Sequence, residues 1–317
     1  MRICLLTSSD ERCGVAVYGQ HLMVALPEVK WTVIGHREWL GVLLDEFDLV
    51  VVNYEPGLFP ALMPRRAFVK GQKTILIMHT SHAGDNHNWL THQFNRVVVH
   101  EPTTEGFDFI PMATPAPLTN DELVETADMR RIGFSFKLGT VGFPFPWKGF
   151  DEVADAAKMM GGHALVIAPK SEHKGADWLG NAERLRAKGA FVATKWMDER
   201  YVLKMLNCCD CIVFAYHGCN PGISGAVRLG LACGRPVVVT KCRMFRDLEA
   251  YADEIGVAES PSAQDIYNAV EKMVTEEWKL PKRVLAETNW EVVGRKYLEL
   301  FNGCIQGDSR MPSLPVA

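Results

Sequence analysis

The sequence lacks any apolar run near the roughly 18 residues needed to cross a bilayer. It also lacks an excess of positive charge. Its net charge of −4 argues against a broad nucleic-acid surface, because such surfaces depend on clustered Lys and Arg. The opening residues MRICLL are too short for the apolar core of a secretion signal, so we expect them to form a strand. These features predict a cytoplasmic protein.

The signatures of metal sites and dinucleotide sites are missing as well. The nine cysteines are odd in number and irregularly spaced, which is typical of reduced core thiols. The segment TSSDERCGVAVYG contains no G-x-G-x-x-G, which argues against a dehydrogenase. No metal-ligand spacing links the histidines of the first half, which are His79, His82, His87, His92 and His100. We therefore expect neither a metal nor a cofactor.

Short apolar runs alternate with helix-like segments through most of the chain. In the first half, strands are predicted at Arg2–Leu6, Trp31–Ile34, Leu49–Asn53, Thr74–His79 and Arg96–His100. In the second half, they are predicted at Lys137–Val141, Ala164–Ala168, Phe191–Thr194, Cys211–Ala215 and Val237–Val239. Nearly continuous apolar strands are typical of parallel sheets covered on both faces. The pattern predicts an α/β fold with two doubly wound, Rossmann-like parallel sheets facing a cleft.

A proline-rich segment, MATPAP, separates the two strand–helix series and suggests the domain boundary. We expect residues 1–133 to form an N-terminal domain and residues 134–288 a C-terminal domain. Residues 289–303 are expected to form a terminal helix that crosses back to the N-terminal domain. The composition of 304–317 is typical of a loose tail.

The stretch GCNPGISGAVRLGLACGRPVVVT carries the strongest local signal for a binding site. A Gly/Pro-rich loop leads to Ser224, a favoured helix N-cap residue, and Gly234 and Pro236 would end the helix before a buried strand. Unpaired backbone N–H groups and the helix dipole favour an anion at such a helix start. The stretch therefore predicts a site for a phosphorylated small molecule, most plausibly a nucleotide-sugar.

Several segments resemble the two-Rossmann-domain (GT-B) retaining glycosyltransferases of family 4. In the second half these are VGFPFPWKGFDEVADAAKMM, DERYVLKMLNCCDCIVFAY, ACGRPVVVT and NWEVVGRKYLELF. In the first half, CGVAVYGQHL is similar to the glycine-led loop and helix after the first strand, and DLVVVNYEPGLF and TILIMHT resemble acceptor-domain segments. Each segment is a loose match, but their order and spacing together are specific.

The chain departs from this family at the donor loop. The family usually carries two glutamates in an E-x7-E spacing, and alignment on ACGRPVV places Pro221 and Leu229 at these positions. Neither side chain can bond a sugar or ribose hydroxyl. The family's arginine before the lysine of the K-G pair is also absent from GFPFPWKG. Asn220, Ser224 and Arg228 are candidate substitutes, although Arg228 fits a solvated helix position equally well.

The resemblance implies a retaining, metal-independent hexosyltransferase that uses a UDP- or GDP-linked sugar as co-substrate. The acceptor would be a hydroxyl of a glycan, a lipid or a phage-type modified DNA base. One alternative is a catalytically inactive nucleotide-sugar-binding module, because the glutamates are missing. Another is a nucleotide-sugar epimerase or phosphorylase on the same fold.

The donor side of the expected site is in the second half of the chain. Lys148 would stabilise the negative charge that gathers on the leaving diphosphate, although an exposed loop lysine is the alternative interpretation. Backbone amides of Gly222 to Gly225 would complete the phosphate cradle. The full set of predicted donor-binding residues is Gly149, Asn220, Gly222, Ile223, Ser224, Gly225 and Arg228.

The acceptor side of the expected site is in the first half. His79 ends a strand where family members often hold a histidine near the sugar, so we expect it to be catalytic; a satisfied core histidine is the alternative. Gly14 and Val15 would approach the cleft from the first loop. Glu55 follows a strand end and is a candidate contact for acceptor hydroxyls.

A basic cluster lies beside apolar residues in the first half of the chain. It comprises Arg65, Arg66, Lys70 and Lys73. Such a cluster is commonly a solvated face, but it also fits contact with anionic lipid headgroups or with DNA. Peripheral membrane association is therefore an alternative to a purely cytoplasmic location.

Overall fold

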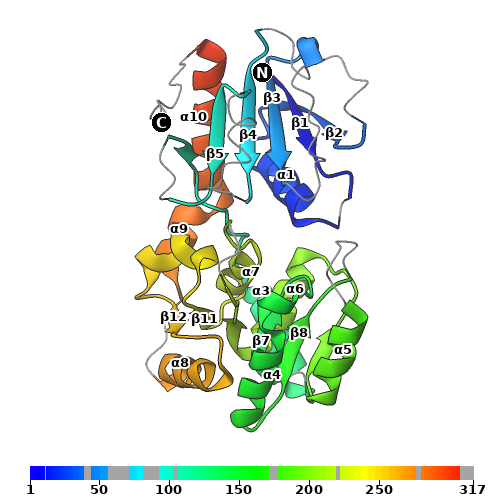
Figure 1. The fold of residues 1–317 in the computed structure, drawn as a ribbon, viewed down its shortest axis with the longest axis vertical. Coiled ribbons are helices and arrows are strands. Elements are labelled where there is room, and N and C mark those ends of the chain that lie inside the picture. The colour runs from blue at the N-terminus through cyan, green and yellow to red at the C-terminus, as the bar shows by residue number, and fades with distance from the viewer. Residues whose placement is uncertain are drawn as a thin grey trace. The chain divides into compact units, whose positions relative to one another are not determined.

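The computed structural model describes residues 1–10, 12–38, 44–55, 71–80, 93–102, 106–133, 135–170, 178–218, 222–275 and 280–307. The chain divides into two compact units. The first contains Met1–Ala113, Pro221–Ile223 and Trp290–Ala317, and the second contains Thr114–Asn220 and Ser224–Asn289. Each unit is built around one six-stranded parallel sheet (Figure 1).

The sheet of the first unit has the strand order β2-β1-β3-β4-β5-β6. Its strands are β1 (Arg2–Thr7), β2 (Lys30–Gly35), β3 (Leu49–Tyr54), β4 (Thr74–Met78), β5 (Arg96–Val99) and β6 (Asp108–Phe109). The other described elements are α1 (Gly14–Ala25), a short 3₁₀ turn at Leu44–Glu46 and α10 (Trp290–Gln306). Every residue of β3 and β4 is buried, as expected for central strands covered on both faces.

The terminal helix α10 packs on the first unit through a buried polar contact and an apolar face. The hydroxyl oxygens of Tyr297 in α10 and Tyr18 in α1 lie 2.9 Å apart. Val293 and Phe301 are completely buried in the same apolar cluster as Ile3 and Leu22. The predicted terminal-helix segment 289–303 corresponds to this helix, which continues to Gln306.

The sheet of the second unit has the order β12-β11-β10-β7-β8-β9. Its strands are β7 (Phe136–Val141), β8 (Ala164–Ile167), β9 (Phe191–Ala193), β10 (Cys209–Phe214), β11 (Val237–Thr240) and β12 (Gly256–Ala258). Its α-helices are α3 (Asn120–Arg131), α4 (Phe150–Met159), α5 (Trp178–Ala187), α6 (Glu199–Asn207), α7 (Ala226–Ala232), α8 (Ala263–Thr275) and α9 (Lys282–Thr288). Two 3₁₀ segments, Pro146–Lys148 and Arg243–Tyr251, complete it.

Helices cover both faces of the second sheet, so its core has two layers. Val153 of α4 and Val270 of α8 belong to one buried cluster, and Leu203 of α6 and Leu231 of α7 belong to the other. Local sequence signals fit these helix starts. Asp198 caps α6, and Thr119 forms a capping box with Glu122 at the start of α3.

The two doubly wound parallel sheets and most strand positions match the sequence-based prediction, with ends shifted by one or two residues. The unit boundary differs from the predicted end of the first domain at residue 133, because α3 belongs to the second unit. The reason is contact with α6. Thr126 Oγ1 donates to Asn207 Oδ1 at 2.7 Å, and Lys204 Nζ donates to Glu125 Oε2 at 2.6 Å. Such bonds cannot be read from the composition of the linker.

Among the described helices, none combines the length and the apolar character that a bilayer-spanning segment requires. The described residues also contain no cluster of three or more His, Cys, Asp and Glu side chains suited to a metal ion.

Candidate functional site

Lys148 and Tyr216 lie where the second sheet reverses its strand order. The strands β7, β8 and β9 progress in one direction, whereas β10, β11 and β12 progress in the other from β7. Lys148 follows β7 and Tyr216 follows β10, so both come after carboxyl ends of neighbouring strands. Ligands of open α/β sheets bind at this kind of topological switch point.

Lys148 is buried, with only 7% of its surface exposed. Its Nζ donates to the Tyr216 hydroxyl oxygen at 2.5 Å and lies 4.0 Å from the centre of that ring. The Trp147 ring centre is 4.5 Å from the same Nζ. Burial lowers the pKa of Lys148 from 10.5 to about 7, because the ammonium loses hydration. The sequence-based alternative of an exposed loop lysine is therefore wrong.

Tyr216 connects Lys148 to Ser224 and was not identified from the sequence. Its hydroxyl oxygen lies 3.0 Å from Ser224 Oγ, and both side chains are almost completely buried. Burial raises the pKa of Tyr216, so the phenol stays protonated at neutral pH. The sequence signal that could have identified Tyr216 is its position shortly after the apolar strand β10.

Ser224 does not cap a helix, so that part of the sequence interpretation is wrong. The helix α7 begins at Ala226 after Gly225, and no side chain caps it. The Ser224 amide donates instead to Met244 O at 3.1 Å. One of the amides expected in the phosphate cradle is thus already paired within the protein. The Ser224 hydroxyl instead bonds the Tyr216 hydroxyl, which in turn bonds Lys148.

Two glycines next to Lys148 have left-handed backbone conformations. Gly149 has a φ of 65°, and a Cβ there would lie 1.9 Å from Ala215 O. Gly149 was predicted to bind the donor, but the group that approaches it closely is the protein's own Ala215 carbonyl. At Gly142, with a φ of 144°, a Cβ would lie 3.5 Å from Lys148 Nζ. Gly142 therefore leaves its side of the ammonium without a side chain.

Arg228 forms a buried ion pair with Asp247. Both side chains are at most 3% exposed, so the alternative of a solvated helix residue is wrong. Asp247 lies in the 3₁₀ segment Arg243–Tyr251, and its partnership with Arg228 has no local sequence signal. Breaking a buried pair of this kind leaves an uncompensated charge and is costly, which gives Arg228 a strong structural role.

In the first unit, His79 and Asn53 lie at the carboxyl ends of β4 and β3. The amide nitrogen of Asn53 donates to Thr7 Oγ1 at 3.0 Å and to Val15 O at 2.6 Å. The Asn53 oxygen therefore faces His79 Nε2, 2.6 Å away. It follows that Nε2 carries the proton and Nδ1 the lone pair. Burial, followed by the charge of His100, lowers the pKa of His79 well below its usual value, so the ring is neutral.

The remaining acceptor-side candidates differ in their surroundings. Thr80 Oγ1 donates to Glu55 Oε2 at 2.6 Å, and burial raises the pKa of Glu55 in spite of this bond. The Val15 backbone carbonyl accepts a hydrogen bond from Asn53, and the Val15 side chain is buried. Gly14 begins α1, and a Cβ there would meet no atom within 4 Å.

The remaining donor-loop candidates are Gly222, Ile223 and Asn220. Gly222 and Ile223 are grouped with the first unit, where Ile223 is buried in the apolar core. Asn220 lies outside the described residues. The same holds for Arg65, Arg66 and Lys70 of the basic cluster, of which only Lys73 is described.

No protein-family model matches the sequence, and no curated protein matches it significantly. Solved structures do match it over nearly their whole length. HepE of Anabaena, crystallised with UDP and glucose, has a TM-score of 0.74 at 12% identity, over 95% of this chain and 99% of that chain. Sucrose-phosphate synthase of Thermosynechococcus elongatus has a TM-score of 0.71 at 14% identity, over 96% and 99%.

A third similar structure is a glycosyltransferase of Rickettsia africae, with a TM-score of 0.69 at 12% identity, over 96% of this chain and 99% of that one. Identities this low establish only the fold. This chain has one six-stranded parallel sheet in each of its two units. The chain therefore has the GT-B fold of these glycosyltransferases, with a Rossmann-like sheet in each of its two units.

Proposed function

We propose that this protein is a retaining glycosyltransferase that moves a hexose from a UDP- or GDP-linked sugar to a hydroxyl acceptor. The observation that carries the proposal is the buried Lys148–Tyr216 pair at the switch point of the second sheet. The fold supports it, because similar structures were crystallised with UDP and with UDP-glucose. The acceptor would be a glycan, a lipid or a modified DNA base.

Lys148 would act on the leaving group. Departure of a nucleoside diphosphate concentrates negative charge on the phosphate oxygens, and a preorganised cation lowers the energy of that state. Burial lowers the pKa of Lys148 to about 7, so the charged ammonium is costly without an anionic partner. A bound diphosphate would raise that pKa and keep the lysine charged.

His79 would act on the sugar or the acceptor. Its neutral ring offers the Nδ1 lone pair, because Asn53 fixes the Nε2 proton. Such a group can accept a hydrogen bond from a sugar hydroxyl. Glu55 would bind acceptor hydroxyls from the next strand end. The proposed reaction needs no metal and no cofactor besides the nucleotide-sugar co-substrate.

A second candidate is a module that binds nucleotide-sugars without turnover. Specific contacts favour it. Leu229 stands where the family has a glutamate, and it packs against the apolar core. Arg228, a candidate substitute for the missing glutamates, forms an ion pair with Asp247. The Ser224 amide donates a hydrogen bond to Met244 O. These contacts reduce the polar groups available to a sugar.

Nucleoside diphosphate release separates the two candidates. The full chain is incubated with a panel of UDP- and GDP-hexoses, with and without glycan, lipid and DNA acceptors. Release that depends on Lys148 and rises with an acceptor supports the transferase. Binding of a nucleotide-sugar without any release supports the inactive module, and product from the donor alone supports an epimerase or phosphorylase. Absence of nucleotide binding contradicts all of these functions.

A further inference from the structure

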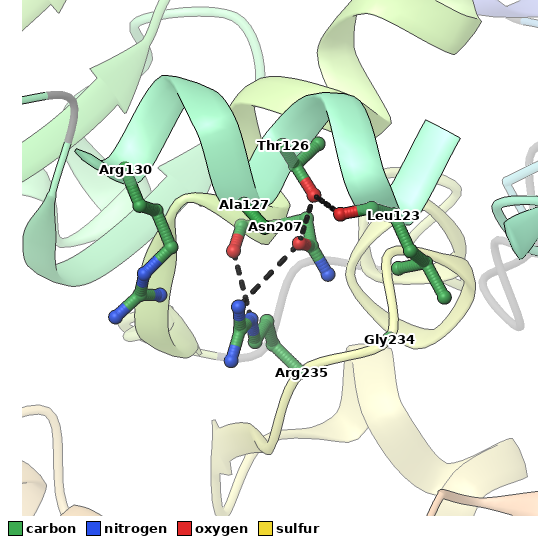
Figure 2. A pocket seen from close by; sticks show the side chains of 7 residues that line it. All are labelled: Leu123, Thr126, Ala127, Arg130, Asn207, Gly234 and Arg235. Carbon is green, nitrogen blue, oxygen red and sulfur yellow. Dashed lines mark hydrogen bonds between the residues drawn. The ribbon is translucent and has the colours of Figure 1, made fainter. Parts of the chain in front are cut away.

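A pocket lies at the amino ends of the strands of the second sheet, whereas Lys148 follows a carboxyl end. It has a volume of about 510 Å³ and is lined by α3, by Asn207 at the end of α6 and by the turn Gly234–Arg235 (Figure 2). Asn207 precedes β10 and Arg235 precedes β11, so the pocket faces the amino ends of these strands. The length of β10 separates it from Tyr216 by roughly 20 Å, at about 3.3 Å per residue. It is therefore distinct from the proposed donor site.

Buried and partly buried hydrogen bonds connect the walls of this pocket. Thr126 Oγ1 bonds Leu123 O at 2.9 Å and Asn207 Oδ1 at 2.7 Å. Asn207 Nδ2 donates to Cys233 O at 2.7 Å, and Arg235 Nε donates to Asn207 O at the same distance. Asn207 is only 3% exposed and joins all three elements. The volume is in the usual range for small-ligand pockets, about 300–1,000 Å³.

The pocket carries an excess of positive charge. Arg130 pairs with Asp210 at 2.7 Å, and Lys137 shares that carboxylate at 3.2 Å. Arg235 bonds the oxygens of Asn207, and within the described part of the chain it has no carboxylate at ion-pair distance. Arg130 and Lys137 thus share one carboxylate, and Arg235 adds a third positive charge beside them. Figure 2 shows the guanidinium groups of Arg130 and Arg235 on the same side of α3.

Arg130 and Arg235 also lie near the C-terminal ends of helices. The partial negative charge of these ends offsets part of the positive charge of the pocket, but not all of it. The C-terminus of a helix carries roughly half a negative elementary charge, and α3, α6 and α7 all end near the pocket. Burial, followed by the like charge of Arg130, lowers the pKa of Arg235. The charged form of Arg235 is therefore disfavoured by its surroundings, and a bound anion would stabilise it.

We propose that this pocket binds the phosphoryl group of a small phosphate ester between Arg130 and Arg235. A guanidinium matches two phosphate oxygens at once, which suits this group better than a single point charge. Leu123 and Ala127 form the apolar part of the lining and contact the carbon skeleton of the ester. The proposal does not depend on the glycosyltransferase function, because the two sites share no residue.

Binding to the full chain tests the proposal, with glucose 6-phosphate, inorganic phosphate and glucose as probes in titration calorimetry. Both phosphate probes should bind at one site per chain, the ester more tightly, and glucose should not bind. Arg130→Gln should weaken binding about ten- to a hundredfold, as for loss of one charged hydrogen bond. Arg131→Gln is the matched control, because that neighbouring arginine is exposed and pairs with Asp128.

Ala127→Phe provides a second test that leaves the arginines intact. Ala127 is exposed in the pocket wall, so a phenyl ring fills the space without breaking a hydrogen bond. This variant should abolish binding of glucose 6-phosphate, whereas Lys148→Ala should leave it unchanged. The proposal is overturned if neither phosphate probe binds, if glucose binds as well as its phosphate, or if only Lys148→Ala removes binding.

Discussion

The ammonium of Lys148 and the hydroxyl of Tyr216 are 2.5 Å apart, although the two residues are 68 positions apart in the chain. The Tyr216 ring also lies against the ammonium, at 4.0 Å from its centre. This contact replaces part of the hydration that Lys148 loses on burial. It places one cation at the switch point of a Rossmann-like sheet, and the first predictions depend on it.

Replacing Lys148 by alanine should lower turnover by roughly two orders of magnitude, the scale seen when one charge-stabilising donor is lost. The measurement is the rate of nucleoside diphosphate release at saturating donor. Lys158→Ala is the matched control, since that lysine is exposed in the last turn of α4. An unchanged rate in Lys148→Ala would remove this residue from the reaction.

Binding of a nucleoside diphosphate should be coupled to proton uptake. With a pKa of about 7, Lys148 is mostly neutral at pH 8.5, and a bound anion raises that pKa so that a proton is taken up. Calorimetry of UDP or GDP binding in two buffers with different ionisation enthalpies measures this uptake. It should approach one proton per chain at pH 8.5 and disappear in Lys148→Met. Equal uptake by both proteins would assign the proton to another group.

The same pKa predicts how stability changes with pH. Between about 7 and 10.5 the unfolded chain binds a proton at Lys148 that the folded chain does not hold. The free energy of unfolding should therefore rise with pH in this window, by up to about 1.4 kcal/mol per pH unit from this group. Urea unfolding of wild type and Lys148→Met should show the steeper rise in wild type.

Tyr216→Phe tests the contribution of the Tyr216 hydroxyl separately from that of its ring. The variant keeps the ring beside the ammonium but loses the bonds to Lys148 and Ser224. Because the charged lysine loses an acceptor, its pKa should fall further, and proton uptake on nucleotide binding should become stronger at pH 7. Unchanged uptake at pH 7 would show that the hydroxyl does not stabilise the ammonium.

Gly149→Ala should destabilise the second unit far more than a left-handed backbone alone explains. The new Cβ would lie 1.9 Å from Ala215 O at a φ of 65°. Gly161 has a similar φ of 74° with no atom within 4 Å, so Gly161→Ala measures the backbone cost, about 1–2 kcal/mol. Thermal and urea unfolding should show a clearly larger loss for Gly149→Ala. Equal losses would mean that the loop moves away from Ala215 easily.

His79→Ala should impair sugar transfer more than it impairs donor binding. The neutral ring is held by Asn53 in the first unit, whereas Lys148, the expected cationic contact of the diphosphate, is in the second. Turnover and the dissociation constant of the nucleotide-sugar are measured on the same variant. His163→Ala, at an exposed position, is the control. A similar loss of both quantities would contradict the assigned role of His79.

The sequence by itself determined the two sheets and most of their strands. The runs LVVV in β3 and ILIM in β4 are apolar throughout, because a parallel strand covered on both faces buries every side chain. The prediction that Lys148 and His79 follow strand ends rested on the same pattern. The loop before α7 was misjudged, because Ser224 is an acceptable N-cap residue in isolation, and so was the unit boundary, because α3 belongs to the second unit.

The tertiary structure decided which polar atoms meet. Tyr216 with Lys148, Asn53 with His79 and Arg228 with Asp247 are each far apart in sequence. Periodicity encodes whether a position is buried, because burial depends on the local direction of the side chain. It does not encode the partner of a buried polar group, which depends on how separate strands and helices pack. The partners of Lys148, His79 and Arg228 therefore became visible only in the folded chain.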